Sequence, residues 1–302
     1  MNNKITLLKE KLRGGVCPAM ATPLLPDGMS VNTAVIPELV NFLLAAGVKG
    51  LFVGGTTGEG ILLSEAERMR LHETAVSAVN GRIPVLLHTG TNQLASTVAL
   101  SQHAATIGAD AIAVVTPYFY AMPDDTLADY YQIVAASVPD LPLLLYDIPQ
   151  LALNGISPTL LSRLARELPS LAGMKSSRPD ARLVRQLIEA APDNLIMLAG
   201  NEAVALGMLA LGADGLISGL STAVPEPFVT LTRLFFQGKM AEAQQQQQII
   251  NQILAQMPKG ARIGALKQIL ATRGIVMGTA VPPRAMPDLD VWAKIRPLLN
   301  QS

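Results

Sequence analysis

A lysine stands at the end of a short apolar run near the middle of the chain. The run "LAGMKSS" spans residues 171–177 and has the small, apolar character of a buried strand up to Lys175. Burial disfavours the ammonium form of lysine, so its neutral amine can attack a carbonyl group and form a Schiff base. The iminium then accepts electrons when a carbon–carbon bond breaks. The alternative is a structural lysine whose ammonium extends into water.

Two other stretches carry groups that such chemistry needs. Tyr146 ends the apolar part of "LPLLLYDIP", and a phenol beside the lysine can move protons. The alternative for Tyr146 is a core aromatic ring with a satisfied hydroxyl. The stretch "GGTTGEG" at residues 54–60 combines Thr56 and Thr57 with glycines, Gly55 among them, that let the backbone approach a ligand closely. Its hydroxyl and N–H groups can bind a carboxylate.

The secondary structure that positions these residues is indicated by a regular repeat along the chain. Short β-rich apolar runs recur along it, beginning at Gly15, Lys49, Ile83, Asp110, Leu141, Ser170, Asp193 and Ala213. Runs without polar alternation are typical of strands buried on both faces of a parallel sheet. Helical patterns fill the gaps, so we predict an α/β fold, a (β/α)8 TIM barrel. An open doubly wound sheet would need a Gly-rich phosphate loop after its first strand, where the chain has "MATPLLPDG".

The predicted helices lie between the runs and after the last one. We expect them at 32–46, 64–79, 91–107, 124–137, 157–167, 179–191 and 202–211, then at 226–237, 239–257, 261–273 and 289–299. Ser64 and Glu67 form a capping-box pattern at the start of the second helix. We therefore divide the chain into a barrel over residues 1–225 and a C-terminal helical extension over 226–302 packed on it. The glutamine run at 244–248 is interpreted as a solvated helix face.

The active site of a (β/α)8 barrel lies at the carboxyl ends of its strands. The polar residues at these predicted ends are Thr22, Thr56, Thr57, Glu59, His88, Thr89, Thr116, Tyr118, Tyr120, Tyr146, Asp147, Lys175, Ser176, Ser177, Asn201, Glu202 and Ser218. Lys175 is the only cation among them. His88 either lines the pocket or makes structural hydrogen bonds.

Composition argues against several other classes of function. The net charge is zero, which gives no basic surface for nucleic acid or an acidic membrane. Of the three histidines, His72 and His103 fall within helical stretches, and no pair has metal-ligand spacing, so we expect no metal site. The single cysteine, Cys17, fits a reducing compartment. The N-terminus has no apolar signal region and no span suits a membrane, so we expect a cytoplasmic protein.

Several motifs in one order resemble the dihydrodipicolinate synthase / N-acetylneuraminate lyase family of class I aldolases. They are "GTTGE" at 55–59, "TPY" at 116–118, "YDIP" at 146–149 and "GMK" at 173–175. The resemblance implies that Lys175 forms a Schiff base with pyruvate or a related 2-oxo acid. It implies Tyr146 as general acid/base, Thr56 as proton relay and Thr57 as a carboxylate ligand. It also implies no cofactor, and a homotetramer built as a dimer of dimers.

The chain departs from the family pattern around the aldehyde. Phe119 stands where the family often has the second tyrosine of a Thr–Tyr–Tyr relay, which leaves Tyr118 or Tyr120 as substitutes. Leu151 stands where dihydrodipicolinate-forming synthases have an arginine, and Ala152–Leu153 replaces the usual "TG". Other departures are Asp147 for asparagine, His88 for glycine, and Glu202–Ala203 where sialic-acid lyases have Asp–Glu. Together these departures argue against both namesake activities. Without the arginine clamp a carboxylated aldehyde should lose affinity, and Leu151 and Leu153 favour a more apolar aldehyde side.

The sequence therefore predicts a Schiff-base lyase that cleaves or forms a 4-hydroxy-2-oxo acid, releasing pyruvate and an aldehyde. A 2-keto-3-deoxy sugar acid is the first choice of substrate. Alternatives are dihydrodipicolinate synthase-like condensation, and dehydration or hydratase-aldolase chemistry through the same iminium. An alternative of another class is a non-catalytic binder of 2-oxo acids. Gly55, Thr57, Tyr118, His88, Leu151 and Ser218 are the candidate substrate-binding residues.

Overall fold

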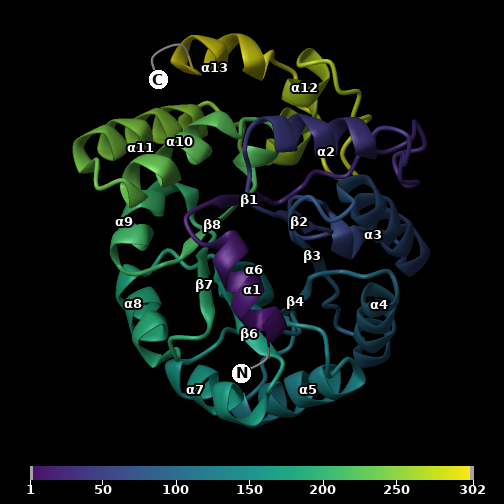
Figure 1. The fold of residues 1–302 in the computed structure, drawn as a ribbon. Helices are drawn as coiled ribbons and strands as arrows, with labels where there is room; N and C mark the ends of the chain where they lie inside the picture. The colour runs from purple at the N-terminus through teal and green to yellow at the C-terminus, as the bar shows by residue number, and fades with distance from the viewer. Residues whose placement is uncertain (1–2, 300–302) are drawn as a thin grey trace.

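Eight parallel strands form a barrel in the computed structural model, which describes residues 3–299. They are β1 (Val16–Pro18), β2 (Leu51–Val53), β3 (Val85–His88), β4 (Ala111–Val115), β5 (Leu143–Asp147), β6 (Leu171–Ser176), β7 (Ile196–Ala199) and β8 (Gly215–Ser218). Neighbours pair in chain order from β2 to β8, and β8 pairs with β1. The ring closes where Ala19, just after β1, pairs with Phe52 of β2. The predicted (β/α)8 fold is confirmed (Figure 1).

Helices surround the strands and continue after the last one (Figure 1). Those of the barrel are α1 (Asn3–Leu12), α2 (Ile36–Ala45), α3 (Glu65–Val79), α4 (Leu94–Thr106), α5 (Asp124–Ser137), α6 (Pro149–Ala152), α7 (Pro158–Glu167), α8 (Ala181–Ala190) and α9 (Ala205–Ala210). The C-terminal ones are α10 (Glu226–Phe236), α11 (Met240–Ala255), α12 (Arg262–Thr272) and α13 (Val291–Leu299). Short 3-10 turns occupy Gly60–Leu62, Glu202–Val204 and Leu220–Thr222. None of the described helices is both long and apolar enough to cross a membrane.

Helix starts follow local side-chain chemistry. Ser64 Oγ accepts a hydrogen bond from Glu67 N (3.2 Å), and this cap begins α3 as expected. The reciprocal half of the predicted capping box is replaced, because Glu67 Oε2 instead accepts the Val31 N–H (2.6 Å). The expected helices at 32–46, 91–107 and 179–191 begin two to four residues too early, since those first residues form the loop and cap.

Alternation along β5 directs side chains to opposite faces of the sheet. Leu143 and Leu145 pack outward with the surrounding helices, whereas Leu144 and Tyr146 belong to the cluster inside the barrel. The register aligns Tyr146 with Lys175 on β6. Neighbouring residues of a parallel pair point to the same face, so the phenol and the amine share the barrel interior.

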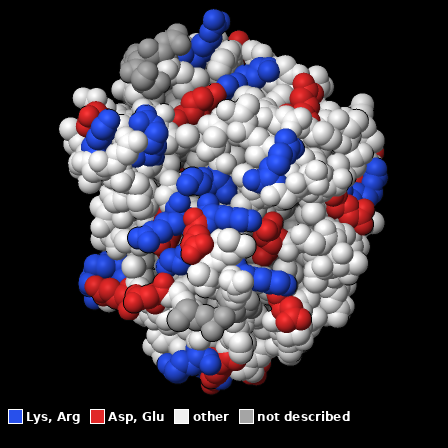
Figure 2. Space-filling view, in the orientation of Figure 1, with Lys and Arg blue, Asp and Glu red and all other residues white. Residues whose placement is uncertain are grey.

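An N-terminal helix that the sequence patterns did not predict closes one end of the barrel. Ile5, Leu8 and Leu12 of α1 pack with the interior cluster, and α1 lies across the barrel end in Figure 1. Lys9 and Arg13 lie 3.5 and 3.7 Å from Asp214. Figure 2 shows cationic and anionic side chains intermixed on this face.

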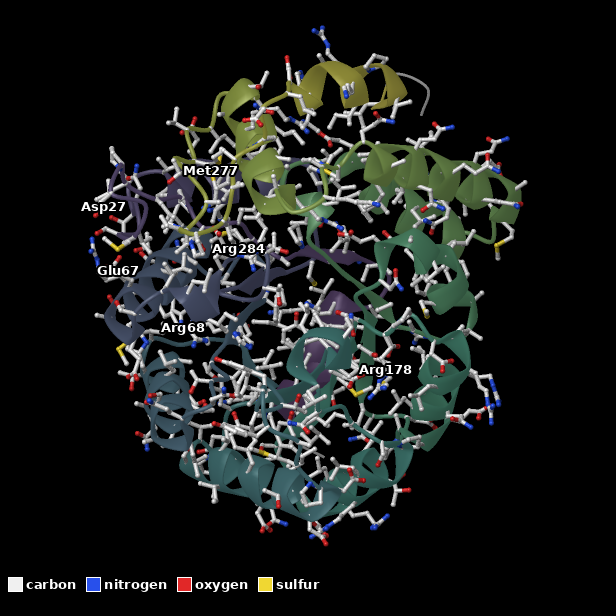
Figure 3. All side chains as sticks on the ribbon, turned by 180° about the vertical axis from the view of Figure 1, so that it is seen from behind. Asp27, Glu67, Arg68, Arg178, Met277 and Arg284 are labelled. Carbon is white, nitrogen blue, oxygen red and sulfur yellow. The ribbon has the colours of Figure 1, made fainter. Side chains whose placement is uncertain are left out.

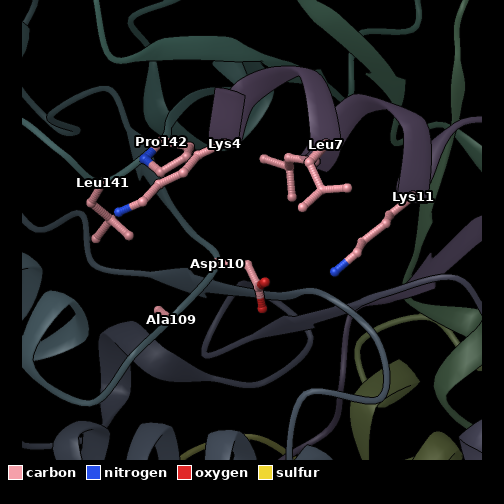
Figure 4. Close-up of a pocket in the computed structure, with 8 residues that line it drawn as sticks. Lys4, Leu7, Lys11, Ala109, Asp110, Leu141 and Pro142 are labelled. Atoms are coloured by element: carbon pink, nitrogen blue, oxygen red, sulfur yellow. The ribbon is translucent and has the colours of Figure 1, made fainter. Parts of the chain in front are cut away.

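Beneath α1 lies a small cavity of about 190 Å³, shown in Figure 4. Lys4 and Lys11 of α1 border it, together with Asp110, which precedes β4, and Pro142, which precedes β5. These positions are at the amino ends of the strands. The cavity is therefore at the opposite end of the barrel from the carboxyl strand ends where chemistry is expected.

The C-terminal helices pack on the barrel through buried polar contacts. Lys267 of α12 and Glu59 of the loop after β2 form an ion pair of 2.7 Å, and both side chains are fully buried. Lys267 Nζ also donates to the Thr279 carbonyl (2.7 Å). The division of the chain at residue 225 stays a prediction.

The glutamine run on α11 is only partly solvated, which corrects its interpretation as an exposed face. Gln246 and Gln247 are buried, while Gln244, Gln245 and Gln248 are exposed. Gln247 Nε2 donates to the Glu202 carbonyl (2.9 Å), and its Oε1 accepts from Leu206 N (2.8 Å). Gln247 thus supports the segment that follows β7.

Candidate active site

A cavity of about 680 Å³ opens at the carboxyl ends of the strands. Its lining includes Thr56, Thr57, Tyr146, Leu151, Lys175, Ser177, Asn201, Glu202, Arg262 and Arg284. A smaller and more apolar branch of about 210 Å³ adjoins it, lined by Thr56, Ile61, His88, Val115, Tyr118, Tyr146, Ile148, Leu151, Ala152 and Arg284. The two branches share Thr56, Tyr146, Ile148, Leu151 and Arg284, so they meet at the phenol.

Lys175 lies at the base of the larger branch and is 4% exposed. Its Nζ lies 4.1 Å from the centroid of the Tyr146 ring and 4.3 Å from that of Phe52. Burial lowers the pKa of Lys175 to about 7, and the nearby Glu202 carboxylate opposes this shift. A substantial share of the amine is thus neutral at physiological pH and can attack a carbonyl.

Tyr146 and Thr56 form a hydroxyl pair facing the cavity. Tyr146 Oη and Thr56 Oγ1 are 2.8 Å apart. Burial raises the pKa of Tyr146 to about 12, opposed by its hydrogen bond with Thr56. The phenol is therefore protonated at rest and can donate a proton. Edge-to-face contacts with Phe52 (5.6 Å) and His88 (5.5 Å) fix its ring.

The loop after β2 presents its residues in different directions. Thr56 and Thr57 line the cavity, whereas Gly55 is buried and lines neither branch. A Cβ on Gly55 would lie 2.2 Å from the Phe52 ring, so glycine permits this loop to pack closely against the ring that Lys175 contacts. Glu59 faces away from the cavity and pairs with Lys267. This motif therefore contributes hydroxyls on one side and an anchor for the C-terminal helices on the other.

Glu202, at the start of the 3-10 turn after β7, is held by several donors. Its Oε1 accepts from Ser218 Oγ (2.8 Å) and Leu220 N (2.7 Å), and its Oε2 pairs with Arg262. Ser218 is buried and does not line either branch; its hydroxyl orients this carboxylate instead. The fixed carboxylate sets part of the electrostatic environment of Lys175.

His88 both borders the apolar branch and makes structural hydrogen bonds. Its Nδ1 lies 3.1 Å from the Gly54 carbonyl, and Arg68 Nη2 donates to the His88 carbonyl (2.6 Å). Burial lowers the pKa of His88 well below its usual value, and the Arg68 and Lys175 cations lower it further. The ring is therefore neutral and packs against Tyr146.

The loops after β4 and β5 present aromatic and aliphatic side chains near the cavity. Tyr118 lines the apolar branch, whereas Phe119 and Tyr120 are 77% and 68% exposed and line neither branch. Leu151 lines both branches. Leu153, expected on the aldehyde side, instead lies outside the lining and is 60% exposed.

Sequence reasoning missed a buried ion pair beside the cavity. Asp147 accepts two hydrogen bonds from Arg178, at 2.6 Å from Nε and 3.0 Å from Nη2. It also accepts from Ser176 Oγ (2.8 Å) and Ile156 N (3.0 Å). The pair joins the last residue of β5 to the loop that follows β6, and these strands carry Tyr146 and Lys175. The sequence signal for this pair was an acidic residue, Asp147, and a basic residue, Arg178, at the carboxyl ends of two adjacent strands.

Other lining residues also escaped the sequence prediction. Arg262 and Arg284 come from the C-terminal extension and approach the cavity from outside the barrel. Phe52 could have been identified from the alternation of β2, which turns it inward beneath Lys175. Within residues 3–299, no group of three or more His, Cys, Asp or Glu side chains could hold a metal ion. The described groups suit amine and hydroxyl chemistry on a carbonyl compound.

Comparisons with known proteins agree with this architecture. A 4-hydroxy-tetrahydrodipicolinate synthase of Methanopyrus kandleri is 35% identical over 231 residues, 76% of this chain and 77% of that protein. The sialic acid aldolase of Ruminococcus gnavus is 28% identical, with a TM-score of 0.91 over 96% of this chain and 98% of that one. A prophage protein of the dihydrodipicolinic acid synthase family from E. coli K12, solved with pyruvate, is 30% identical, with a TM-score of 0.88 over 95% and 97% of the two chains.

The match extends over nearly the whole sequence. Residues 12–301 fit the dihydrodipicolinate synthetase family. This range includes Thr56 in the loop after β2, Tyr146 on β5, Lys175 on β6 and the C-terminal helices. The chain therefore belongs to the dihydrodipicolinate synthetase family of class I aldolases and lyases.

Proposed function

We propose that this protein is a Schiff-base lyase that cleaves or forms a 4-hydroxy-2-oxo acid, with pyruvate as one product or substrate. The observation that carries the proposal is the convergence of three groups on one cavity. A buried Lys175 amine of lowered pKa lies over the Tyr146 ring, and Tyr146 is hydrogen-bonded to Thr56. A nucleophile and a proton donor on adjacent strands are what imine chemistry requires.

The first half of the reaction forms the iminium. The neutral Lys175 amine attacks the ketone carbon, C2, and gives a carbinolamine. Tyr146, protonated at rest because its pKa is about 12, donates its proton to the carbinolamine hydroxyl, which leaves as water. The phenolate that remains lies beside the new iminium cation, and their attraction in a buried site stabilises the pair.

The second half breaks the carbon–carbon bond. The Tyr146 phenolate takes the proton of the C4 hydroxyl, the C3–C4 bond breaks, and its electrons move into the iminium to give an enamine and an aldehyde. The enamine is protonated at C3 and hydrolysed, which releases pyruvate and the Lys175 amine. Thr56, 2.8 Å from the phenol, passes protons between Tyr146 and the cavity. Thr57 and the N–H groups of its loop bind the 2-oxo acid carboxylate.

A 2-keto-3-deoxy sugar acid is the proposed substrate, because the larger branch is rich in groups that bind hydroxyls. Gln150, Ser177 and Asn201 line it together with the two threonines. Condensation as in dihydrodipicolinate synthase, and dehydration or hydratase-aldolase chemistry through the same iminium, are the alternatives. The apolar branch beside Tyr118 and Leu151 favours the hydratase-aldolase version with a hydrophobic aldehyde.

A screen of pyruvate release over 2-keto-3-deoxy acids and related 4-hydroxy-2-oxo acids tests this function. The wild type is expected to release pyruvate from at least one member, and Lys175→Met and Tyr146→Phe to release far less. If a pyruvate adduct forms but no member of a broad panel is turned over, the protein is a non-catalytic 2-oxo-acid binder. The exposed ring of Phe119, which carries no hydroxyl, is the observation behind that second candidate.

We also propose self-association into a homotetramer of the cytoplasm. Phe119, Tyr120, Leu151 and Leu153 are large apolar side chains between 60% and 77% exposed. Asn154 ties the two loops that carry them, since its Nδ2 donates to the Tyr120 carbonyl (2.7 Å). Apolar patches of this kind mark protein interfaces. Light scattering of the purified protein is expected to give the mass of four chains; the mass of one chain would refute the assembly.

A further inference from the structure

The C-terminal extension contributes a cation to the cavity mouth. Arg284 lies in the segment between α12 and α13, and its side chain borders both branches of the cavity. In Figure 3, which views the molecule from behind, Arg284 and Arg178 lie on opposite sides of the barrel centre. The Arg284 side chain is 39% exposed, so its guanidinium is accessible to a ligand entering the cavity.

The segment that carries Arg284 is fixed to the barrel. The Arg284 N–H donates to the Val281 carbonyl (3.0 Å), and the Val281 N–H donates to Glu59 Oε1 (2.9 Å). The same carboxylate pairs with the buried Lys267, which also donates to the Thr279 carbonyl. Met277, earlier in the segment, accepts from Leu24 N (2.9 Å). The arginine therefore stands on a preorganised support rather than on a free tail.

The other arginines near the mouth are already paired. Arg178 makes its two hydrogen bonds to Asp147 and does not line the cavity. Arg262 pairs with Glu202. For Arg284, the nearest carboxylate oxygen is that of Glu59, 3.9 Å from Nε, and this carboxylate is neutralised by Lys267 at 2.7 Å.

The charges of the residues that line the larger branch also leave Arg284 as the cation unpaired among them. Lys175, Arg262 and Arg284 are cationic and Glu202 is anionic. With Lys175 as the neutral amine, two cations and one anion remain, a surplus of one positive charge. Since Arg262 is paired with Glu202, this surplus resides on Arg284. Among residues 3–299, no protein group accepts a hydrogen bond of normal length from its guanidinium.

We propose that Arg284 binds a terminal anion, a carboxylate or a phosphate monoester, on the substrate end remote from the Schiff base. This inference rests on the proposed function, because Lys175 fixes the 2-oxo end. The planar guanidinium presents paired N–H donors that match either oxyanion. Hydroxyl-binding groups then lie between two charged ends, so the substrate class becomes a 2-oxo sugar acid with a second anionic terminus.

The experiment uses trapping with cyanoborohydride, which needs imine formation and no turnover. The half-saturating concentration is measured for 2-oxoadipate and for 2-oxohexanoate, which have equal length and differ in the terminal carboxylate. A second pair is a 2-keto-3-deoxy sugar acid with and without a terminal phosphate. Wild-type protein is expected to favour the anionic member of at least one pair by about tenfold to hundredfold, the range for hydrogen bonds to a charged group.

Arg284→Met is expected to abolish that preference. Arg284→Lys is expected to retain part of it, and Arg296→Met, an exposed arginine on α13, to retain all of it. A larger ratio of half-saturating concentrations for the first pair identifies the bound anion as a carboxylate. A larger ratio for the second pair identifies it as a phosphate. No preference in the wild type, or one that survives Arg284→Met, overturns the inference alone. Failure of pyruvate itself to form an adduct overturns the proposed function as well.

Discussion

The pH dependence of imine formation follows directly from the burial of Lys175. With a pKa of about 7, about half of the amine is neutral at pH 7, against roughly one in 3,000 for the ordinary value of 10.5. The neutral share falls to about a tenth at pH 6 and exceeds about nine tenths at pH 8. Tyr146, with its pKa of about 12, keeps its proton throughout this range, so the rising limb reports the amine.

The assay is the initial rate of pyruvate trapping by cyanoborohydride between pH 5.5 and 9, followed by intact mass. The rate is expected to rise with a midpoint near pH 7 and to level off above pH 8. Glu202→Gln removes the carboxylate that raises the pKa of Lys175, so its midpoint is expected at lower pH. Glu242→Gln, at an exposed position on α11, is the matched control and should keep the wild-type midpoint.

Two results would refute this reasoning. A midpoint at pH 9 or above means that water solvates the Lys175 ammonium in the protein and burial does not lower its pKa. An unchanged midpoint in Glu202→Gln means that this carboxylate does not act on the amine.

Three further perturbations have defined outcomes. Tyr146→Phe keeps the ring contacts with Phe52 and His88 but removes the proton donor, so kcat for pyruvate release should fall about 10²- to 10⁴-fold with little change in Tm; a loss under fivefold contradicts its role. Lys175→Met removes a group whose pKa is lowered on folding. Between about pH 7 and 10.5 the Lys175 amine is protonated in the unfolded chain but neutral in the folded one, so the stability of the wild type rises with pH across that window. The variant should therefore be more stable than the wild type at pH 6, by up to about 5 kcal/mol, and this gain should shrink towards pH 10. Urea unfolding at pH 6 and pH 10 measures the gain in the free energy of unfolding. A gain that does not change with pH would contradict the lowered pKa of Lys175. Glu59→Gln leaves Lys267 buried without its partner and should cost about 3–5 kcal/mol in urea unfolding, whereas a cost below about 1 kcal/mol would mean that the pair does not hold the extension to the barrel.

The barrel and the inner part of the site could be predicted because barrel geometry is repetitive. Once apolar runs are assigned to strands, the residue that ends each run must lie at the mouth. Lys175, Tyr146 and Thr56 follow from that rule and meet in one cavity. Period-two alternation fixes the inward direction of Tyr146, and it also predicts the inward Phe52.

The outer part of the site could not be predicted, because it is built by segments without periodicity. Arg284 lies between two helices, and its position depends on the pairing of Glu59 with Lys267, residues that are more than 200 positions apart. Helix α1 was missed because its three buried apolar residues are scattered among lysines. Gln246 and Gln247 were predicted to be solvated because glutamine is polar. Gln247 is nevertheless buried, since its amide finds hydrogen-bond partners in the segment that follows β7.

The identity of the nucleophile is the central claim, and peptide mapping of the reduced pyruvate adduct tests it most directly. Lys267 provides an internal control, since it is a second buried lysine but is ion-paired and lies outside the cavity lining. We expect one adduct per chain, on the peptide that contains Lys175, and none in Lys175→Met. An adduct on another lysine, or one that persists in Lys175→Met, would contradict the account.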